Sequence, residues 1–431
     1  MADPSGSARS AKPVSVGEGS CANAAGLAGG TDAVAGVAAG AAGESGVAGA
    51  SSGAAAEPAV PPMWRSSFPA MGTRVDIIGW GGNGMAIVNA IVEVVARHED
   101  LWSVFRVSSE VSRLNAAVAS AGGGEGVSRH LAESAEASVG LVVSEDTDRL
   151  LCDALALAEA TGGAFNPMIG PLVAAWDVKA MRAAYVAGAP LPPAPSSRVV
   201  EAALRASSWG LLSRVGERRW AVGVPAESVG GVDAPSPRLD LGGIAKGYTA
   251  DACRDLAVSM GARGVLVSVG TSSVSVSGTR ADGSPWRAGL RDPHGAPTAI
   301  AGVVELPADG MASLSTSGDN LGPLGDARAL CAGPVSERVA DLRARETSRE
   351  TPGGGGRIFD HHIIDPRTGY PARAGVRQVS VVASSGVLAE GLSTALLVDP
   401  SIDVSDVVAR WARATGAPAS AKVVGLVRAG R

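Results

Sequence analysis

One short segment combines residue types that could bind a phosphate group. In LDLGGIAKGY, residues 239–248, Asp240 is followed by paired glycines and by Lys246. Glycines at a helix N-terminus leave backbone N–H groups free for an anion, and a lysine adds a point charge. The segment matches neither the GxxxxGK[ST] nor the GxGxxG nucleotide motif. It is therefore either a phosphate cradle or only a tight corner before a helix.

Two of the five histidines stand together in FDHHIIDPRTGYPA, residues 359–372. His361 and His362 lie beside Asp365 and Arg367, and an imidazole near a carboxylate could act as a general base or bind a charged group. The alternative is a proline–glycine turn in which Asp365 bonds its own backbone.

A carboxylate and a hydroxyl lie four residues apart in GVLAEGLSTALLV, residues 386–398. Glu390 and Thr394 fall on one helical stripe, whereas leucine and alanine cover the other side. The pair could offer two hard oxygen ligands to Mg²⁺, or it could form a plain solvent-exposed face.

Two further segments carry weaker signals. In TGGAFNPMIGPLVAAW, residues 161–176, a glycine turn precedes Ala164, Phe165 and Asn166. These three residues either line a ring-binding pocket or lead from a helix into a core strand. STSGDN, residues 315–320, is predicted to be a Ser/Thr-rich turn that could donate hydrogen bonds to phosphate.

The surrounding sequence predicts the elements that must position these residues. RLDLGG is predicted to end a strand and to run into a helix whose apolar residues recur every four positions before Gly261. Ser144 is the expected N-cap of a helix that stops at Gly162 and Gly163. Periodicity predicts strands at 71–80, 264–279 and 378–385, and helices at 83–105 and 386–398. The irregular order of these elements predicts an α+β fold with mixed sheets and flanking helices.

Composition limits the kind of protein. The chain has 431 residues, is 46% hydrophobic and carries a formal net charge of −5, so it offers no basic surface for nucleic acid. Its four cysteines form no CxxC pair, which argues against a disulfide scaffold or a zinc site and suits a reducing compartment. No apolar run is long enough for membrane insertion and no signal peptide is recognisable, so a cytoplasmic protein is expected.

The chain is expected to contain one folded domain. Residues 1–60 are almost entirely Ala, Gly, Ser and Val without periodicity, which predicts a disordered tail. The domain is predicted to span residues 61–431, with an irregular glycine-rich insertion at about 321–357.

In order along the chain, eight segments resemble the FAD:protein FMN transferases, the ApbE family, over about residues 63–410. The segments are MGT (71–73), SSEVSRLN (108–115), TGGAFNP (161–167), LDLGGIAKGY (239–248), WRAGLRDP (286–293), STSGD (315–319), HHIIDPRTGYPA (361–372) and AEGLSTAL (389–396). The resemblance implies an α+β fold that holds a flavin nucleotide in a groove.

The resemblance also implies the site residues. Those expected to contact FAD are Met71, Phe105, Ala164, Phe165, Asn166, Asp240, Lys246 and His362. The Gly243 carbonyl, Glu390 and Thr394 are expected to bind Mg²⁺ or Mn²⁺. His362 is the candidate catalytic residue, because it matches a histidine at the reacting phosphate.

The implied activity is transfer of the FMN half of FAD to a threonine hydroxyl of an acceptor protein, with Mg²⁺ and release of AMP. One alternative is an FAD pyrophosphatase, in which water replaces the threonine. Another is a non-catalytic FAD-binding or carrier protein.

Three positions depart from the family pattern. Asn166 replaces an aspartate, Glu390 replaces a metal-binding aspartate, and Thr271 replaces the second of two glycines. Glutamate is one methylene longer, and Mg²⁺ demands near-ideal octahedral geometry. These departures bear on the rate of turnover more than on FAD binding.

Overall fold

The computed structural model describes residues 60–121, 140–186, 192–225, 235–293, 299–307, 309–318 and 362–428, with the isolated positions 189 and 295. The predicted tail, apart from Val60, and the predicted insertion lie outside the described residues, as does His361.

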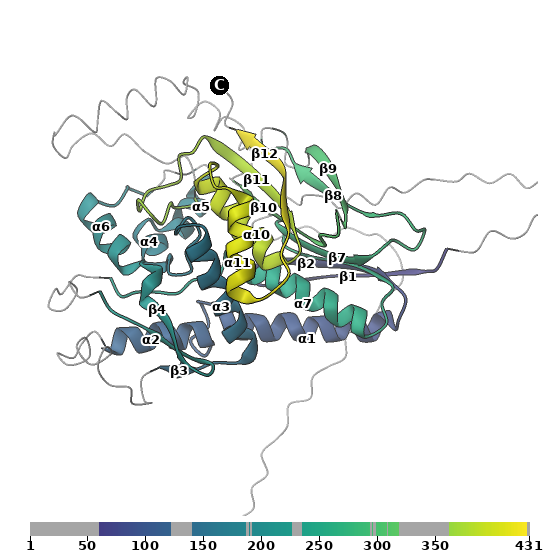
Figure 1. The fold of residues 1–431 in the computed structure, drawn as a ribbon, viewed down its shortest axis with the longest axis horizontal. Helices are drawn as coiled ribbons and strands as arrows, with labels where there is room; N and C mark the ends of the chain where they lie inside the picture. The colour runs from purple at the N-terminus through teal and green to yellow at the C-terminus, as the bar shows by residue number, and fades with distance from the viewer. Residues whose placement is uncertain are drawn as a thin grey trace, which may run out of the picture. The chain divides into compact units, whose positions relative to one another are not determined.

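A seven-stranded sheet forms the centre of the fold, in the order β1-β2-β6-β7-β10-β11-β12 (Figure 1). Every pair of neighbouring strands in it is antiparallel. Its strands are β1 (Met63–Ala70), β2 (Thr73–Trp80), β6 (Gly264–Val269), β7 (Ser273–Gly278), β10 (Ser313–Gly318), β11 (Val376–Ala383) and β12 (Ala421–Arg428). The strands predicted at 71–80, 264–279 and 378–385 are confirmed.

Two smaller antiparallel sheets accompany it. One is the hairpin of β8 (Trp286–Arg291) and β9 (Ile300–Leu306), and the other has the order β3-β5-β4. The strands of the latter are β3 (Leu141–Val142), β4 (Leu212–Gly216) and β5 (Arg219–Val222). Trp286 and Leu306 of the hairpin share a buried cluster with Leu266 of β6, so the hairpin covers one face of the central sheet.

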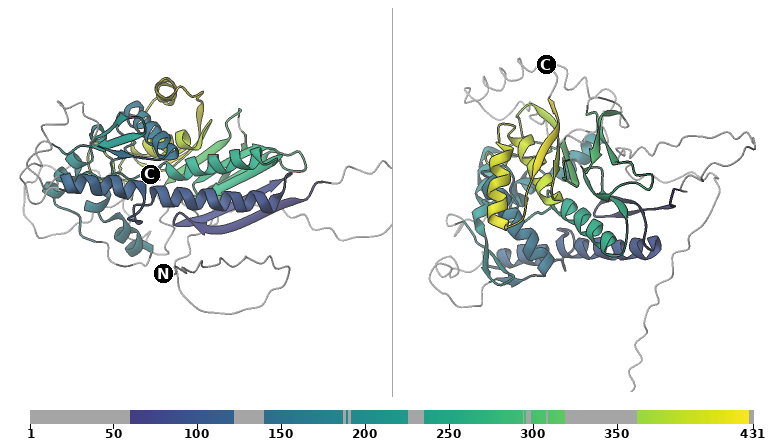
Figure 2. Two further views of the ribbon diagram at one scale, coloured as in Figure 1. Left: turned by 90° about the horizontal axis from the view of Figure 1, so that it is seen from below. Right: turned by 45° about the vertical axis from the view of Figure 1, so that its right-hand side comes forward.

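Helices cover the opposite face. α7 (Ala245–Ser259) packs on β6 and β7, and α10 (Gly386–Val398) packs on β10 and β11. α1 (Gly84–Trp102) lies beside α7 and completes this layer (Figure 2). Both faces of the sheet are therefore buried, and apolar residues of β6 point alternately to either side.

The remaining helices surround the end of this layer. They are α2 (Glu110–Ala121), α3 (Glu145–Ala160), α4 (Gly170–Ala175), α5 (Val178–Val186), α6 (Ser197–Ala206), the 3₁₀ turn Trp209–Leu211 and α11 (Val404–Thr415). The predicted N-cap of α3 is confirmed, since Ser144 accepts a hydrogen bond from the N–H of Thr147. The α+β class is also confirmed. Within the described ranges, no helix has the length and apolar character needed to cross a membrane.

Two local predictions are wrong. RLDLGG ends no strand: the N–H and C=O of Leu239 pair with the side chain of Asn115, at 2.7 and 3.0 Å, instead of with a neighbouring strand. Ser315–Gly318 form part of strand β10 and not a turn, because all four pair with β11 and Ser315 also pairs with β7.

α7 and α10 cross where each has a glycine. A Cβ on Gly247 would lie 2.3 Å from the carbonyl oxygen of Gly386, and a Cβ on Gly386 would lie 2.3 Å from that of Gly247. No side chain fits at either position, so glycine is required for the helices to approach this closely.

Each helix also caps the other. Glu390 of α10 accepts a hydrogen bond from the N–H of Gly247 at 2.8 Å, and Asp251 of α7 accepts one from the N–H of Gly386 at 2.6 Å. The first N–H groups of a helix have no partner within it, and a carboxylate at that end is favoured by the helix dipole. The two carboxylates therefore join the helices at their closest point.

The crossing predicts a large effect of one methyl group. Gly247→Ala should lower the free energy of unfolding by about 2–4 kcal/mol, because the helices must separate to admit the Cβ. Gly302→Ala on β9 is the control, since a Cβ there meets nothing within 4 Å. Urea unfolding compares the variants, and equal stability of the two would contradict the account of the crossing.

A buried histidine lies in the same layer. The ring of His98 in α1 packs against those of Trp102 and Tyr248, with ring centroids 4.4 and 5.6 Å apart, and its Nδ1 lies 3.0 Å from the hydroxyl of Thr249. Burial lowers the pKa of His98 to about 4, although the nearby Asp146 acts in the opposite direction.

This shift predicts a stability that depends on pH. The unfolded chain takes up a proton at His98 near pH 6.5, but the native state does so only near pH 4, so stability falls as the pH drops between these values. At roughly 1.4 kcal/mol per pKa unit, the contribution approaches about 3 kcal/mol. His98→Gln should flatten this dependence in urea unfolding between about pH 4 and pH 7. Parallel curves for the two proteins would contradict the prediction, since other groups titrate in both.

Candidate functional site

The glycine turn before α7 is held by its own backbone and by Asp240. Asp240 Oδ1 accepts a hydrogen bond from the N–H of Gly242 at 2.8 Å, and the carbonyl of Leu241 accepts from the N–H groups of Ile244 and Ala245 at 3.0 and 2.9 Å. Among the described residues, no acceptor bonds the N–H groups of Gly243 and Lys246. These two N–H groups are therefore available to an anion, whereas the N–H of Gly247 is taken by Glu390.

Glu390 lies at the same place and is buried, with 3% of its surface exposed. Its Oε2 accepts the hydrogen bond from Gly247, and its Oε1 accepts one from the hydroxyl of Ser273. Lys246 Nζ lies 3.5 Å from Oε1. A solvent-exposed face is thus the wrong interpretation of Glu390.

Lys246 links the glycine turn to α10. Its ammonium group donates a hydrogen bond to the carbonyl of Gly242 at 2.8 Å while it faces Glu390. The side chain is 26% exposed, so it lies at the boundary between the buried carboxylate and solvent.

Thr394 follows Glu390 by one helical turn and belongs to a chain of hydroxyl groups. Its Oγ1 lies 3.1 Å from the hydroxyl of Ser317, which lies 2.8 Å from that of Ser393. Ser393 in turn donates to the carbonyl of Glu390 at 3.1 Å. Ser317 of β10 therefore orients the side chain of Thr394.

The serines that hold these side chains are not among the residues predicted from the sequence. Ser273 and Ser275 of β7 face α7 and α10, and so do Ser313 and Ser317 of β10. The signal was the alternation of serine in SSVSVSG and SLSTSG, which is the period of one strand face. Ser275 and Ser313 both donate to Asp251 at 2.7 Å, and burial raises the pKa of this carboxyl against the opposing effect of these bonds.

The predicted ring-binding residues lie against the glycine turn. Ala164 and Phe165 are buried, and a Cβ on Gly243 would lie 3.3 Å from Cε2 of Phe165. Asn166 has a structural role: its amide donates to the carbonyl of Ser207 at 2.7 Å and accepts from the N–H of Met168 at 2.8 Å. Their contact with FAD stays a prediction.

Met71 forms the tight turn between β1 and β2 together with Gly72. Its φ of 52° and the φ of 67° at Gly72 fit a two-residue hairpin turn with two left-handed positions. A methionine is strained in that conformation, and here its N–H is held by Glu99 Oε2 at 3.1 Å. Such strain is commonly found at functional positions.

Phe105 and Thr271 lie at the surface. Phe105, in the loop before α2, is 80% exposed, and Lys179 Nζ lies 5.3 Å from its ring centroid. Thr271 is exposed, while Gly270 with a φ of 70° takes the left-handed position in this turn. The side chain of Thr271 is therefore accommodated at the surface, and the position that needs the left-handed conformation is still a glycine.

The segment around His362 forms a small hairpin closed by a bridge between Ile364 and Pro371. The turn interpretation of Asp365 is confirmed, since its Oδ1 accepts from the N–H of Arg367 at 2.9 Å. Arg367 also donates to Asp399 Oδ2 at 2.8 Å, which fastens the hairpin to the end of α10.

His362 is partly buried at the start of this hairpin. Burial and the charge of Arg182 lower the pKa of His362 to about 4. The imidazole is therefore neutral near pH 7 and can exchange a proton with a hydroxyl group.

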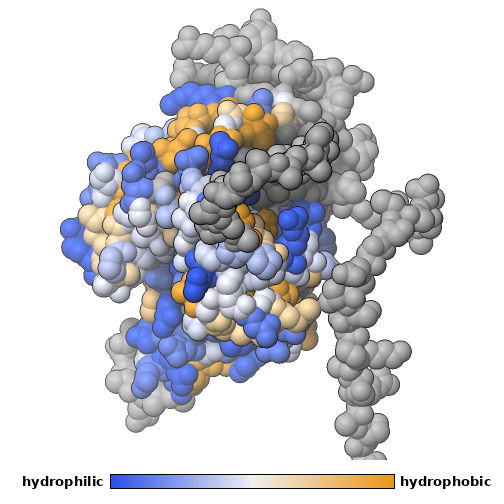
Figure 3. Space-filling model, turned by 90° about the vertical axis from the view of Figure 1, so that its right-hand side faces the viewer, coloured by the Kyte–Doolittle hydropathy of each residue, from blue (hydrophilic) through white to orange (hydrophobic). Residues whose placement is uncertain are grey.

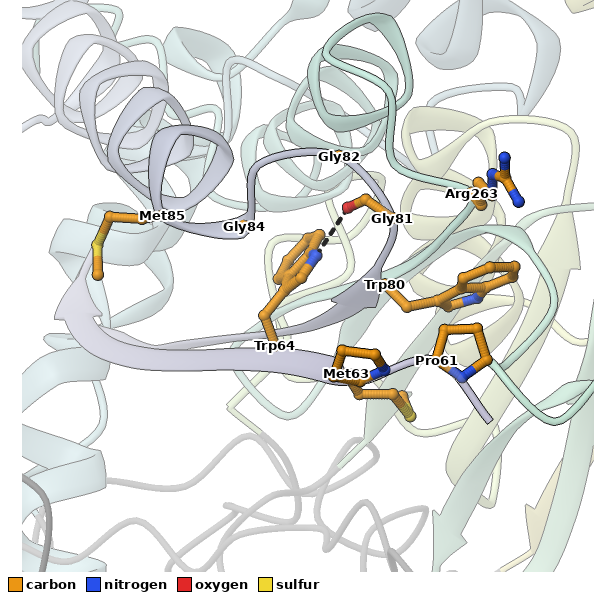
Figure 4. A pocket seen from close by; sticks show the side chains of 10 residues that line it. Pro61, Met63, Trp64, Trp80, Gly81, Gly82, Gly84, Met85 and Arg263 are labelled. Carbon is orange, nitrogen blue, oxygen red and sulfur yellow. Dashed lines mark hydrogen bonds between the residues drawn. The ribbon is translucent and has the colours of Figure 1, made fainter. Parts of the chain in front are cut away.

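A separate hollow of about 470 Å³ lies at the other end of β2. It is bounded by Met63, Trp64, Trp80 and Arg263, and the indole of Trp64 donates to the carbonyl of Gly81 at 3.0 Å (Figure 4). No residue predicted to bind FAD lines it, and the length of β2 separates it from Met71 by roughly 25 Å. On the side of the molecule shown in Figure 3, hydrophobic and hydrophilic residues are interspersed.

The predicted metal ligands are oxygen atoms of the kind that Mg²⁺ prefers. Glu390, Thr394 and the Gly243 carbonyl offer hard oxygens, and an ammonium group already lies against the carboxylate. In the described part of the chain, no group of three or more His, Cys, Asp or Glu side chains could hold a metal. A site with one carboxylate is chemically compatible with Mg²⁺, which often takes one or two carboxylates and completes its shell with substrate phosphates.

The fold is α+β, and Lys246, Glu390 and the glycine turn meet where α7 and α10 cross. The chain belongs to the ApbE family, whose sequence pattern matches residues 71–324 and 338–415. The family resemblance predicted from the sequence is confirmed.

Several curated relatives are named FAD:protein FMN transferase. That of Treponema pallidum is 30% identical over 274 residues, which cover 61% of this chain and 62% of the relative. That of Vibrio cholerae is 26% identical over 340 residues, 77% of this chain and 80% of the relative. The chain thus spans less than two thirds of the Treponema protein, as it does of the Salmonella typhimurium protein, at 63%.

Solved structures share the fold. The ApbE protein of Thermotoga maritima superposes with a TM-score of 0.56 and 26% identity, covering 85% of this chain and 97% of that one. The flavin transferase ApbE of Vibrio cholerae gives a TM-score of 0.54 at 23% identity, over 83% and 93% of the two chains.

The hydrogen bond from Ser273 to Glu390 predicts a measurable contribution to stability. Ser273→Ala should lower the free energy of unfolding by about 1–3 kcal/mol, because a buried carboxylate oxygen loses a donor. Ser67→Ala on β1, an exposed serine, is the control. Equal urea midpoints for the two variants would show that Ser273 does not support Glu390.

Proposed function

We propose that this protein is an FAD:protein FMN transferase, which moves FMN from FAD to a threonine hydroxyl of an acceptor protein and releases AMP. The observation that carries this proposal is the meeting of Lys246, Glu390 and the glycine turn at the crossing of α7 and α10. Membership of the ApbE family and the name shared by its curated relatives support it.

The N-terminus of α7 would hold the pyrophosphate of FAD. Its free N–H groups at Gly243 and Lys246 and the positive end of the helix dipole favour an anion there. Phe165, whose ring lies 3.3 Å from where a Cβ on Gly243 would be, would flank the nucleotide together with Ala164. Asp240 keeps one carboxylate oxygen for a hydrogen bond from the ligand, since Oδ1 is taken by Gly242.

Glu390, Thr394 and the Gly243 carbonyl would hold the metal. A bound Mg²⁺ supplies positive charge that offsets the negative charge developing on the AMP leaving group. Ser273 and the N–H of Gly247 fix the orientation of the Glu390 carboxylate, which limits the effect of its additional methylene. Mn²⁺ has similar oxygen preferences and would fit the same ligands.

His362 would receive the acceptor hydroxyl. The threonine oxygen forms a bond to the phosphorus of FMN, the bond from that phosphorus to the AMP oxygen breaks, and the hydroxyl proton passes to the imidazole. A pKa of about 4 makes His362 a weak base, so it would take the proton only as the new bond forms. Little other covalent work falls to the protein, as is usual in phosphoryl transfer.

The first experiment measures AMP released from FAD with Mg²⁺, with and without an acceptor domain that carries a threonine for flavinylation. Covalent flavin on the acceptor is followed by fluorescence of the denatured protein, and EDTA provides the metal-free control. AMP together with metal-dependent covalent flavin is the expected result. AMP without covalent flavin would favour the pyrophosphatase, whereas bound FAD without AMP would favour the carrier protein.

The same assay tests the metal ligand. Glu390→Gln keeps the size of the side chain but removes its charge, and AMP release should fall by about 100-fold or more. Glu217→Gln, in an exposed turn between β4 and β5, is the matched control. Full activity of Glu390→Gln at saturating Mg²⁺ would exclude Glu390 as the ligand.

A further inference from the structure

The ammonium group of Lys246 lies where a cation is needed. We propose that Lys246 is the resident cation of the metal site, that a divalent metal displaces it from Glu390, and that the released lysine then binds the phosphate of the nucleotide. This inference rests on the metal site of the proposed function.

Lys246 contacts oxygen atoms of the kind that would bind a metal cation. Its Nζ lies 2.8 Å from the carbonyl oxygen of Gly242 and 3.5 Å from Oε1 of Glu390. The neighbouring carbonyl, of Gly243, is a predicted metal ligand, and Glu390 is another. A backbone carbonyl of the glycine turn and the α10 carboxylate therefore already hold one positive charge between them.

Charge balance explains why the ammonium is there. Glu390 is nearly fully buried, and a buried carboxylate is costly unless a cation or several donors compensate it. Among the described residues, Lys246 is the one cation within 4 Å of this carboxylate. Ser273 and Gly247 add neutral donors but no charge. Without a metal, Lys246 thus supplies the counter-charge.

A divalent cation and the ammonium cannot share this carboxylate at close range without repelling each other. A metal bound to Glu390 would therefore drive Lys246 outward. The lysine side chain is unbranched, 26% exposed and placed in the first turn of α7, next to the free N–H groups of Gly243 and Lys246 itself. The displaced ammonium would join these N–H groups, where an anion is favoured.

The exchange couples the two ligands. Metal binding frees the Lys246 ammonium for the nucleotide phosphate, and a nucleotide that attracts Lys246 leaves the Glu390 carboxylate available to the metal. By thermodynamic linkage each ligand then increases the affinity for the other. Removing Lys246 should consequently change the two affinities in opposite directions.

The test uses Lys246→Met in the full chain without FAD. Mn²⁺ binding, measured by electron paramagnetic resonance, should become about fivefold tighter or more, because the competing ammonium is gone. FAD binding, measured by flavin fluorescence, should become weaker by about the same factor or more. Lys422→Met, on the exposed strand β12, is the matched control and should change neither affinity. Lys246→Arg should restore weak Mn²⁺ binding because it retains the charge.

Unchanged or weaker Mn²⁺ binding by Lys246→Met would overturn the inference. It would leave the proposed function standing if the wild-type protein still binds Mn²⁺ and releases AMP. A wild-type protein that binds no Mn²⁺ would overturn both.

A measurement on the wild-type protein avoids any folding defect of the variants. Without FAD, Mn²⁺ should increase the rate at which an amine-reactive reagent labels Lys246, as followed by mass spectrometry, and should leave labelling of Lys422 unchanged. Equal or lower labelling of Lys246 with Mn²⁺ would contradict its displacement.

Discussion

At the crossing of α7 and α10, two backbones approach so closely that neither Gly247 nor Gly386 has room for a side chain. The contact is possible because a carboxylate from each helix bonds the free N–H groups at the start of the other. Helix packing, helix capping and the position of Glu390 therefore depend on one another. Glu390 reaches the glycine turn only while the helices touch, and the helices touch only while both positions remain glycine.

The central sheet completes this arrangement by presenting hydroxyl groups where a sheet under two helices would ordinarily present apolar side chains. Ser273 bonds Glu390, while Ser275 and Ser313 bond Asp251. The buried carboxylate of Glu390 and the largely buried one of Asp251 can be accommodated in this layer because each is supplied with several donors and with one cation. The polar site is therefore built into the core layer of the fold, whereas Phe105, which is predicted to contact FAD, is exposed in the loop before α2.

Most of the architecture could be predicted from local patterns. The cap at Ser144, the glycine stop after α3 and the strands β2 and β11 follow from residue types within a few positions, and α10 follows from its apolar content. The conformation of the segment RLDLGG could not be predicted, because an extended chain with this pattern usually pairs with a strand, and only the distant Asn115 decides otherwise.

The site could be predicted only in part. Glu390 and Thr394 are visible in the sequence as a pair, but the burial of Glu390 and its bonds to Ser273 and Gly247 depend on contacts more than a hundred residues apart. Motif order predicted which residues belong to the site, whereas the groups that orient Glu390 could be identified only from the fold.

The mutual capping of α7 and α10 also has a consequence for motion. The first turn of a helix normally frays, and its amides exchange with solvent through small local openings. Here, opening the first turn of either helix breaks a bond to a buried carboxylate on the other and exposes that charge without its donor. Both ends must therefore open together, in an event close to global unfolding. Amide hydrogens at Gly247 and Gly386 would exchange at nearly the same slow rate, and the site would remain intact until the fold itself is lost.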